Sequence, residues 1–311
     1  MLPRSASAAW PAWALHFALR TVSLRARVGD LAQALERAHS ARRGAHDAGD
    51  TPGELASLAA AAQLTVLSGG DPTQLLTEAE TLVAQQQQQQ QQQRHGVAIH
   101  LHAVKVLHAL SQGYYLAVRD SLGPMDTLLA SPGDGHSPSS PAACDLEGLP
   151  PPGAMTCLLH FARSAWSRCE RPNAEKLALA RGELDAMQAL CVAQLASLQV
   201  DVQATAEASV SPRTAHLACP YLILHLAASE SHTRLALLTT DLVAGATHAA
   251  AGAGLCSRWP HALAPCAAEA RLACALYAHA VGDYQSAVAQ CLAAEKARIQ
   301  HHMILHCAPD L

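Results

Sequence analysis

The stretch from Trp259 to Gln300 constrains the fold of this chain more than any other part of the sequence. It consists of one apolar segment predicted to be helical, a tight turn at Gly282-Asp283-Tyr284, and a second such segment. Small side chains at Ala275, Ala287 and Ala294 mark positions where two packed helices leave little room. Gly282 can adopt the left-handed conformation that ends a helix, and Asp283 can accept hydrogen bonds from the free amides that begin the next. The sequence therefore predicts a helical hairpin.

The composition extends this prediction to the whole chain. Aromatic residues make up only 4% of the 311 residues, and alanine and leucine are abundant, which favours helices over strands. Each hairpin in a stacked array contacts mainly its neighbours, so such an array needs few aromatic side chains. We predict an all-α fold, a superhelical solenoid of degenerate tetratricopeptide-like helical hairpins.

Three similar layouts precede residue 131. Each places a turn glycine between two apolar, alanine-bearing segments: 14–45 with Gly29, 54–84 with Gly70, and 97–130 with Gly113. Pro72 suits the first position of a helix, and Pro124 is expected to kink or shorten the helix that contains it. The glycines do not keep the regular tetratricopeptide interval, so the repeat is degenerate.

Two low-complexity segments divide the chain. Nine glutamines at 85–93 are expected either to extend the preceding helix or to form a disordered insert. Residues 131–153 are rich in Ser, Pro and Gly and predict a loop or linker. The predicted organisation is an array over 1–130, this linker, and a second array over 154–311. We favour a loop within one continuous solenoid over a boundary between separate domains.

The second array begins with two helices over 154–198, interrupted around Arg171-Pro172-Asn173. A polar loop is expected over 199–213. The stretch 214–252 predicts another pair of helices, with its turn near Ser229-Glu230-Ser231. The hairpin of 259–300 then completes the array.

Charge and hydropathy exclude several classes of protein. The net charge is −4 with neutral histidines, and no long basic run is present, so a nucleic-acid surface is not expected. No apolar run is long enough to span a membrane. The first 29 residues carry four arginines and no acidic residue, as in an organelle transit peptide, although the same residues also suit a repeat helix.

The cysteines and histidines give little indication of a metal or cofactor. Ten cysteines occur without a C-x-x-C pair, which favours reduced, buried thiols in an intracellular compartment. His302 and His306 would share a helical face near Cys307, so a metal site in the tail is one interpretation. We favour no metal and no cofactor, because 18 histidines make such clusters common.

The sequence carries no recognisable catalytic motif. It contains no G-x-S-x-G elbow and no glycine-rich phosphate loop. Glu54, Glu78 and Glu80 are expected to be solvated helix charges. We therefore predict a protein that is not an enzyme and has no small-molecule substrate. The alternative is an enzyme that uses His302, His306 and Cys307.

A family resemblance rests on the order of several segments. Gly282-Asp283-Tyr284 is followed by Ala293-Ala294-Glu295, the stretch 149–176 places a Leu-Pro segment before an apolar helix, and 97–130 contains a Gln112-Gly113-Tyr114 turn. Together these resemble the small, tetratricopeptide-like subunit of the cohesin-loading complex, the partner of the Nipped-B-like large subunit. The similarity covers about 54–300. Alanine replaces bulkier core residues, and the array is shorter than the family's at both ends, as in a divergent or partial copy.

The resemblance implies a non-catalytic scaffold in the nucleus, associated with chromatin. Such a scaffold would bind the N-terminal segment of the large HEAT-repeat subunit and support loading of cohesin onto chromatin for sister chromatid cohesion. The implied groove residues are His100, Leu107, Glu269, Leu276 and His279, although the two leucines could instead pack within their hairpins. The alternative function is a generic tetratricopeptide adaptor. The alternative location is the cytoplasm, or an organelle if the Arg-rich N-terminus is a transit peptide.

Overall fold

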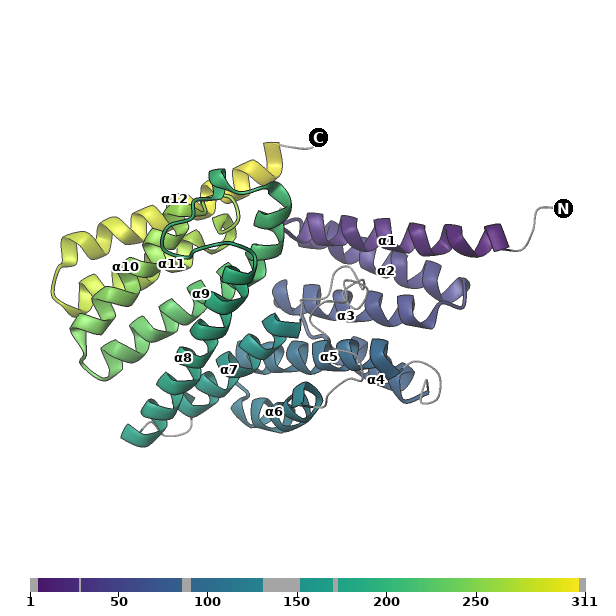
Figure 1. Ribbon diagram of the computed structural model, residues 1–311, viewed down its shortest axis with the longest axis horizontal. Helices are drawn as coiled ribbons and strands as arrows, with labels where there is room; N and C mark the ends of the chain where they lie inside the picture. Colours follow the sequence, from purple (N-terminus) through teal and green to yellow (C-terminus); the bar gives the residue numbers. More distant parts are fainter. Residues whose placement is uncertain (1–4, 28, 86–90, 131–151, 170–172, 308–311) are drawn as a thin grey trace. The chain divides into compact units, whose positions relative to one another are not determined.

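The computed structural model describes residues 5–27, 29–85, 91–130, 152–169 and 173–307. The regular elements in these ranges are all helices, with no strand. The chain divides into two compact units, Met1–Met155 (unit 1) and Thr156–Leu311 (unit 2). Within each unit, helices pack against their neighbours in the chain, which confirms the predicted all-α, solenoid-type arrangement (Figure 1).

Unit 1 is a series of helices joined by short turns. The helices are α1 (Ser5–Arg27), α2 (Leu31–Asp47), α3 (Thr51–Leu67), α4 (Thr73–Gln85), α5 (Gln91–Gln112) and α6 (Tyr115–Ala130). Each packs on the next, and α3 also packs on α5. Ala34 and Ala38 of α2 are fully buried, as are Leu58 and Ala59 of α3. Close packing of small residues therefore forms much of this core.

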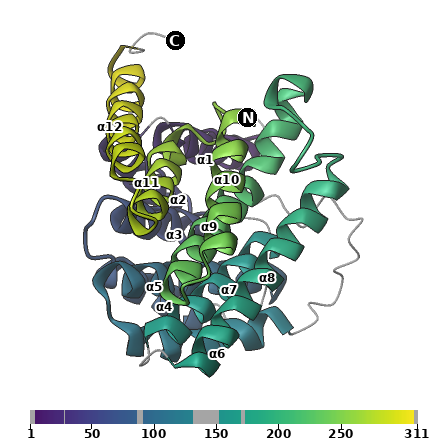
Figure 2. The same ribbon diagram turned by 90° about the vertical axis from the view of Figure 1, so that its left-hand side faces the viewer.

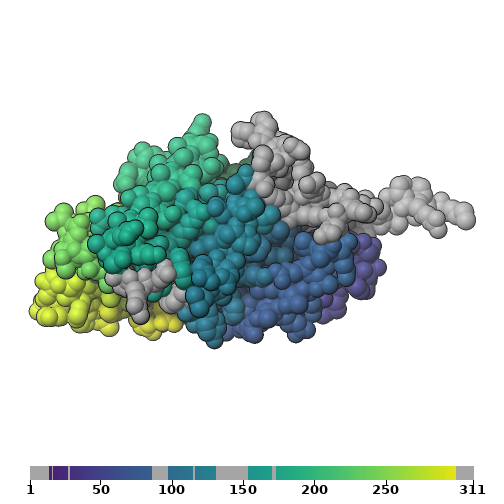
Figure 3. All heavy atoms as spheres, turned by 90° about the horizontal axis from the view of Figure 1, so that it is seen from below, coloured from purple at the N-terminus to yellow at the C-terminus, as the bar shows by residue number. Residues whose placement is uncertain are grey.

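Unit 2 repeats this pattern with longer helices. They are α7 (Pro152–Cys169, which begins at the end of unit 1), α8 (Ala174–Ser197), α9 (Pro212–Leu238), α10 (Leu242–Arg258), α11 (Ala267–Ala280) and α12 (Tyr284–Cys307). From α8 onward each packs on the next, and α9 also packs on α11 (Figure 2). The predicted packing residues Ala275, Ala287 and Ala294 are all buried. Figure 3 shows the heavy atoms of one face of the molecule, coloured by position in the sequence.

The predicted turn chemistry recurs along the chain. Gly29 and Gly282 lie between helices with φ of 78° and 83°. The aspartate that follows each one accepts a hydrogen bond from the amide three residues later: Gln33 N donates to Asp30 (3.2 Å) and Ser286 N to Asp283 (3.0 Å). Gly49 (φ 67°) and Asp50 form the same turn between α2 and α3, which the sequence analysis did not identify. Gly113 has φ 73°, at the turn between α5 and α6.

The turn between α9 and α10 was placed wrongly. Ser229-Glu230-Ser231 lies inside α9. The Ser229 hydroxyl donates to the His225 carbonyl at 3.1 Å, so serine is accommodated within the helix. The chain turns instead at Thr240, which has φ 57°, and Asp241 caps α10 by accepting from Ala244 N at 3.0 Å. A left-handed threonine is uncommon, which explains why a search for glycine missed this turn.

Three smaller predictions in unit 1 also need correction. The left-handed residue of the α3–α4 turn is Gly69 (φ 78°), and Gly70 follows it. Pro72 lies just before α4, and its carbonyl accepts from Leu76 N at 2.9 Å. Pro124 neither ends nor shortens α6, which continues to Ala130.

In the glutamine run, Gln85 ends α4 and Gln91 begins α5, whereas 86–90 lie outside the described residues.

The helix expected to begin at Trp259 begins at Ala267. Trp259 is instead fully buried at the end of α10. The segment between these helices is held to the polar loop after α8, because the Glu207 carboxylate accepts from His261 N (2.8 Å) and Ala262 N (3.0 Å). The predicted linker 131–153 lies outside the described residues except for its last two, which begin α7.

Candidate protein-binding surface

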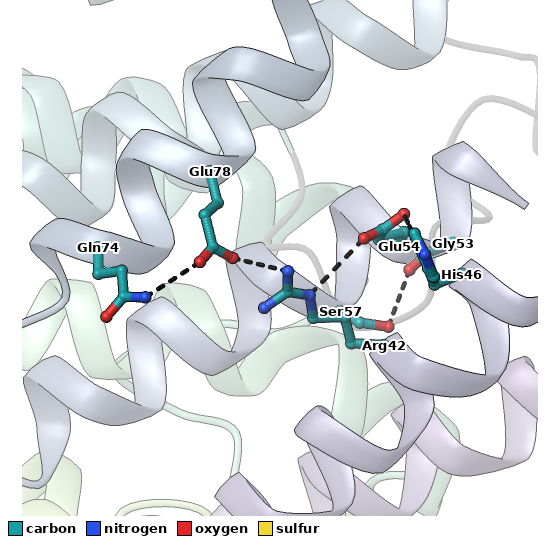
Figure 4. Close-up of polar contacts among 7 residues, drawn as sticks. All are labelled: Arg42, His46, Gly53, Glu54, Ser57, Gln74 and Glu78. Carbon is teal, nitrogen blue, oxygen red and sulfur yellow. Dashed lines mark hydrogen bonds and ion pairs between the residues drawn. The ribbon is translucent and has the colours of Figure 1, made fainter.

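A polar network joins α2, α3 and α4 in unit 1 (Figure 4). Arg42 Nη2 lies 2.7 Å from Glu78 Oε2, and Arg42 Nε lies 3.7 Å from Glu54 Oε1. His46 Nδ1 lies 3.2 Å from Glu54 Oε2, and Gln74 Nε2 donates to Glu78 Oε1 at 3.3 Å. One arginine therefore links two carboxylates from different helices.

This network corrects the expectation of a solvated charge for Glu54, whereas Glu78 is partly buried and Glu80 is exposed as expected. The Glu54 side chain is only 10% exposed. Its position in the first turn of α3 also favours a negative charge, because the amides there are unsatisfied. Glu80 is paired with Lys105 of α5. These carboxylates hold helices together, and none is placed as a free acid or base.

The two groove residues implied for unit 1 do not form an open surface. His100 is 2% exposed, and its two ring nitrogens make no side-chain hydrogen bond with the described part of the chain. Its burial lowers the pKa of the imidazole to about 4. Leu107 is half-buried on the same helix. His100 is therefore not accessible at the surface of unit 1, and its place in a binding groove stays a prediction.

The three groove residues implied for unit 2 do share one exposed face of α11. Glu269, Leu276 and His279 are exposed, and so is Leu272. Leu272, Leu276 and His279 follow one another at intervals of four and three residues, which places them on one side of a helix. Other positions around α11 carry buried alanines, including Ala273 and Ala275.

A second exposed apolar face lies on α12. Tyr284, Val288 and Leu292 are 64%, 59% and 67% exposed and recur every four residues. Ala287 and Ala294, seven residues apart, are buried. The exposed residues therefore lie away from the side that packs on α11.

Two contacts show how these faces meet. The rings of His279 and Tyr284 pack edge to face with centroids 5.5 Å apart, on one edge of the hairpin. On the other edge, Arg271 Nη1 donates to Gln290 Oε1 at 3.3 Å. Helical periodicity places the exposed leucines of α11 and the exposed apolar residues of α12 on the edge marked by the ring contact. We call this surface the hairpin strip; its residues are Leu272, Leu276, His279, Tyr284, Val288 and Leu292.

Acidic side chains lie beside the hairpin strip. Glu269 shares the exposed face of α11. Glu230 of α9 is partly buried, and its Oε1 has no hydrogen-bond partner among the described residues. Burial raises the pKa of the Glu230 carboxyl to about 7; Arg234 opposes this shift and Glu269 adds to it.

Two hollows lie away from the hairpin strip. The wider one, about 510 Å³, lies between α1 and α2 beside the exposed Phe17. The smaller one, about 90 Å³, is lined by Arg181, Asp185, His232 and His248. The two imidazoles stack at 4.4 Å with an interplanar angle of 10°, so their nitrogen lone pairs lie in nearly parallel planes and do not converge on one ion.

The cysteines whose side chains the structure describes are free but are not all buried as expected. Cys169 and Cys291 are exposed, whereas Cys157 and Cys191 are fully buried with their Sγ atoms 3.6 Å apart. Burial raises the pKa of the Cys266 thiol to about 12, and that of Cys256 rises as well. Neutral thiols of this kind are weak nucleophiles.

The part of the chain that the structure describes contains neither a metal-ligand cluster nor a membrane-spanning helix. No group of three or more His, Cys, Asp or Glu side chains there could hold a metal ion. None of the described helices is both long and apolar enough to cross a membrane. The side chains of His302, His306 and Cys307, proposed as an alternative site, lie outside the described residues.

Four of the six hairpin-strip residues were not predicted from the sequence as binding residues. Leu272, Val288 and Leu292 were read only as part of a helical pattern, and Tyr284 only as a turn residue. The spacing of apolar residues could have identified them. Val288 and Leu292 follow Tyr284 at intervals of four, while Ala287 and Ala294 occupy another face of the helix. Two apolar faces on one helix predict contacts on two sides.

Comparison of this chain with protein-family models, curated proteins and solved structures gives no match.

Proposed function

We propose that this protein is a non-catalytic scaffold that binds a segment of another protein. The hairpin strip is the observation that carries this proposal. Its five large apolar side chains, all but His279, are between 43% and 67% exposed on adjacent helices. Contiguous exposed apolar surface of this kind marks protein interaction sites, and paired helices offer a groove for a helix or peptide.

The state of the reactive side chains supports a non-catalytic role. Glu54 and Glu78 are held by Arg42, and Glu80 is paired with Lys105. A general acid or base must be free to exchange a proton with substrate. These groups instead hold helices together.

The resemblance to the small subunit of the cohesin loader suggests a specific partner. On this proposal the strip binds the N-terminal segment of the large HEAT-repeat loader subunit, and the chain acts in the nucleus by supporting the loading of cohesin onto chromatin. Glu269, Leu276 and His279, the groove residues that the resemblance implies in unit 2, lie on or beside the strip. This agreement supports the proposal.

One observation favours a second candidate, a generic tetratricopeptide-type adaptor. His100, which the loader resemblance places in the groove, is buried in α5. A protein that binds only through its last hairpin would not need that residue. Such an adaptor would recognise a short helix and not a long extended segment.

Co-purification tests the two candidates. The full chain is tagged and mixed with the purified N-terminal segment of the large loader subunit from the same organism. The loader proposal predicts a stable complex in gel filtration. No complex with that segment, combined with recovery of other partners from nuclear extract, contradicts the loader proposal and leaves the adaptor.

A further inference from the structure

Two cysteine side chains meet inside unit 2, in the contact between α7 and α8. Cys157 lies in the second turn of α7 and Cys191 in the second half of α8, and both side chains are fully buried. Their Sγ atoms are 3.6 Å apart, and the Cys191 thiol donates to the Cys157 sulfur. A disulfide bond is about 2.05 Å long, so each sulfur needs to move by less than about 1 Å to form one. The two thiols are therefore within reach of a covalent bond.

The packing around the pair holds both sulfurs in place. The two cysteines belong to one apolar cluster with three residues of α8 and two of α9: Ala180, Leu184, Met187, Ala228 and Leu235. The Cys157 Sγ also lies 3.9 Å from the Met187 carbonyl oxygen. A close-packed interior leaves such side chains few alternative orientations. The approach of the two sulfurs is thus built into the core of unit 2.

The hydrogen bond between the thiols gives them different reactivity. It lowers the pKa of the Cys157 thiol, an effect that burial opposes. The same hydrogen bond raises the pKa of the Cys191 thiol, and burial adds to that shift. The thiolate is the nucleophile in cysteine chemistry. Cys157 is therefore the sulfur that reacts first with an oxidant, and Cys191 is the sulfur that completes the bond.

Solvent comes within about one helical turn of the pair. His160 of α7 and Glu183 of α8 bridge the same two helices, with Nδ1 2.6 Å from Oε2, and their side chains are 21% and 28% exposed. His160 lies three residues after Cys157, and Glu183 lies four residues before Met187. These intervals correspond to about 5 Å along a helix. A local opening at this edge, which needs less free energy than global unfolding, admits a molecule as small as hydrogen peroxide.

We propose that Cys157 and Cys191 are a redox modification site, at which hydrogen peroxide produces a reversible disulfide that fastens α7 to α8. The Cys157 thiolate attacks one peroxide oxygen, the O–O bond breaks, and a sulfenic acid and hydroxide form. The Cys191 sulfur then attacks the Cys157 sulfur, the S–S bond forms, the S–O bond breaks, and water leaves with the Cys191 proton. Two thiols together lose two electrons, and one peroxide becomes two waters. This site does not depend on the proposed scaffold function.

Peptide mapping after peroxide treatment tests the proposal. The full chain carries Cys144→Ser, so that the tryptic peptides 120–163 and 182–213 each contain one cysteine, Cys157 and Cys191. We expect these two peptides to be joined in a monomeric protein and to separate after treatment with dithiothreitol. The bond joins residues 34 positions apart, so it restrains the unfolded chain and should raise the Tm by about 5 °C or more.

A variant with one thiol removed is the matched control. Cys191→Ala, in the same Cys144→Ser chain, should show no change in Tm on oxidation. A rise equal to that of the parent would place the stabilising bond elsewhere and overturn the proposal. If this variant does not fold, the peptide map of the parent decides alone.

Three results of the peptide map would contradict the proposal. In the first, the two peptides stay separate while the exposed Cys169 and Cys291 are oxidised, which shows that the buried pair does not react. In the second, Cys157 proceeds to sulfinic acid without a bond to Cys191. In the third, the joined peptides occur only in a disulfide-linked dimer, so that the bond forms between two copies.

Discussion

The α2–α3–α4 region and the α11–α12 hairpin contain the same kind of turn, but they differ in which side chains have partners within the unit. Gly49-Asp50 and Gly282-Asp283 end one helix and cap the next in the same way. In the first region the buried Glu54 and the partly buried Glu78 are paired within the unit, through Arg42. In the second, large apolar side chains are exposed. Turn chemistry thus determines the hairpin, while the exposed side chains determine whether it holds the fold together or binds a partner.

Acid should destabilise the buried region through His100. The pKa of this buried imidazole is lowered to about 4, below the 6.5 of an unfolded chain. As pH falls, the unfolded chain binds the proton first, so stability is lost between pH 6.5 and pH 4. His100→Leu removes the part of this dependence that comes from His100, so the variant should lose about 3 kcal/mol less of its free energy of unfolding over that window. Urea unfolding at a series of pH values measures this, and parallel profiles for the two proteins would contradict it.

Removing Arg42 should have the next largest effect. Arg42→Met leaves the buried Glu54 and the partly buried Glu78 without their shared cation. Breaking a buried pair is costly, but Arg42 is 30% exposed, so we expect a loss of about 2 kcal/mol in the free energy of unfolding. Arg43→Met, at the next and exposed position, is the matched control and should change stability by less than about 0.5 kcal/mol. Equal losses would show that the network contributes little.

These contrasts also show what the sequence could reveal. The hairpins and their glycine turns were predictable because Gly and Asp have specific roles where one helix ends and the next begins. The turn at Thr240 was not, since only the surrounding packing holds a threonine in that conformation. The strip residues Leu276 and Val288 are exposed, whereas Leu58 in a similar helix is fully buried. Helical periodicity gives each residue a face, but only tertiary packing decides which faces are covered.

The shared turn can itself be tested. Gly282 has φ 83° and open space around its Cβ position, so Gly282→Ala adds backbone strain without a clash. We expect a loss of about 1 kcal/mol. Thr240→Gly relieves strain at φ 57° and should instead stabilise the protein by about 0.5 kcal/mol. Thermal unfolding measures both, and the same sign for the two variants would contradict the account.

The smallest effect on stability is expected on the hairpin strip. Val288 is 59% exposed, so Val288→Asp should change the free energy of unfolding by less than about 0.5 kcal/mol. Val243→Asp, on the 80% exposed Val243 of α10, provides the matched control. A loss well above that of the control would show that the strip is covered within the protein and would weaken its assignment as a binding surface.

The affinity of the partner segment for two aspartate variants tests the central claim most directly. Leu276 and Leu217 are 46% and 45% exposed on helices of the same unit, and only Leu276 belongs to the hairpin strip. Titration of the loader segment should show that Leu276→Asp weakens binding about tenfold or more, equivalent to about 1.4 kcal/mol. Leu217→Asp should leave it unchanged. Equal affinities for the two variants would contradict the assignment of this strip as the binding surface.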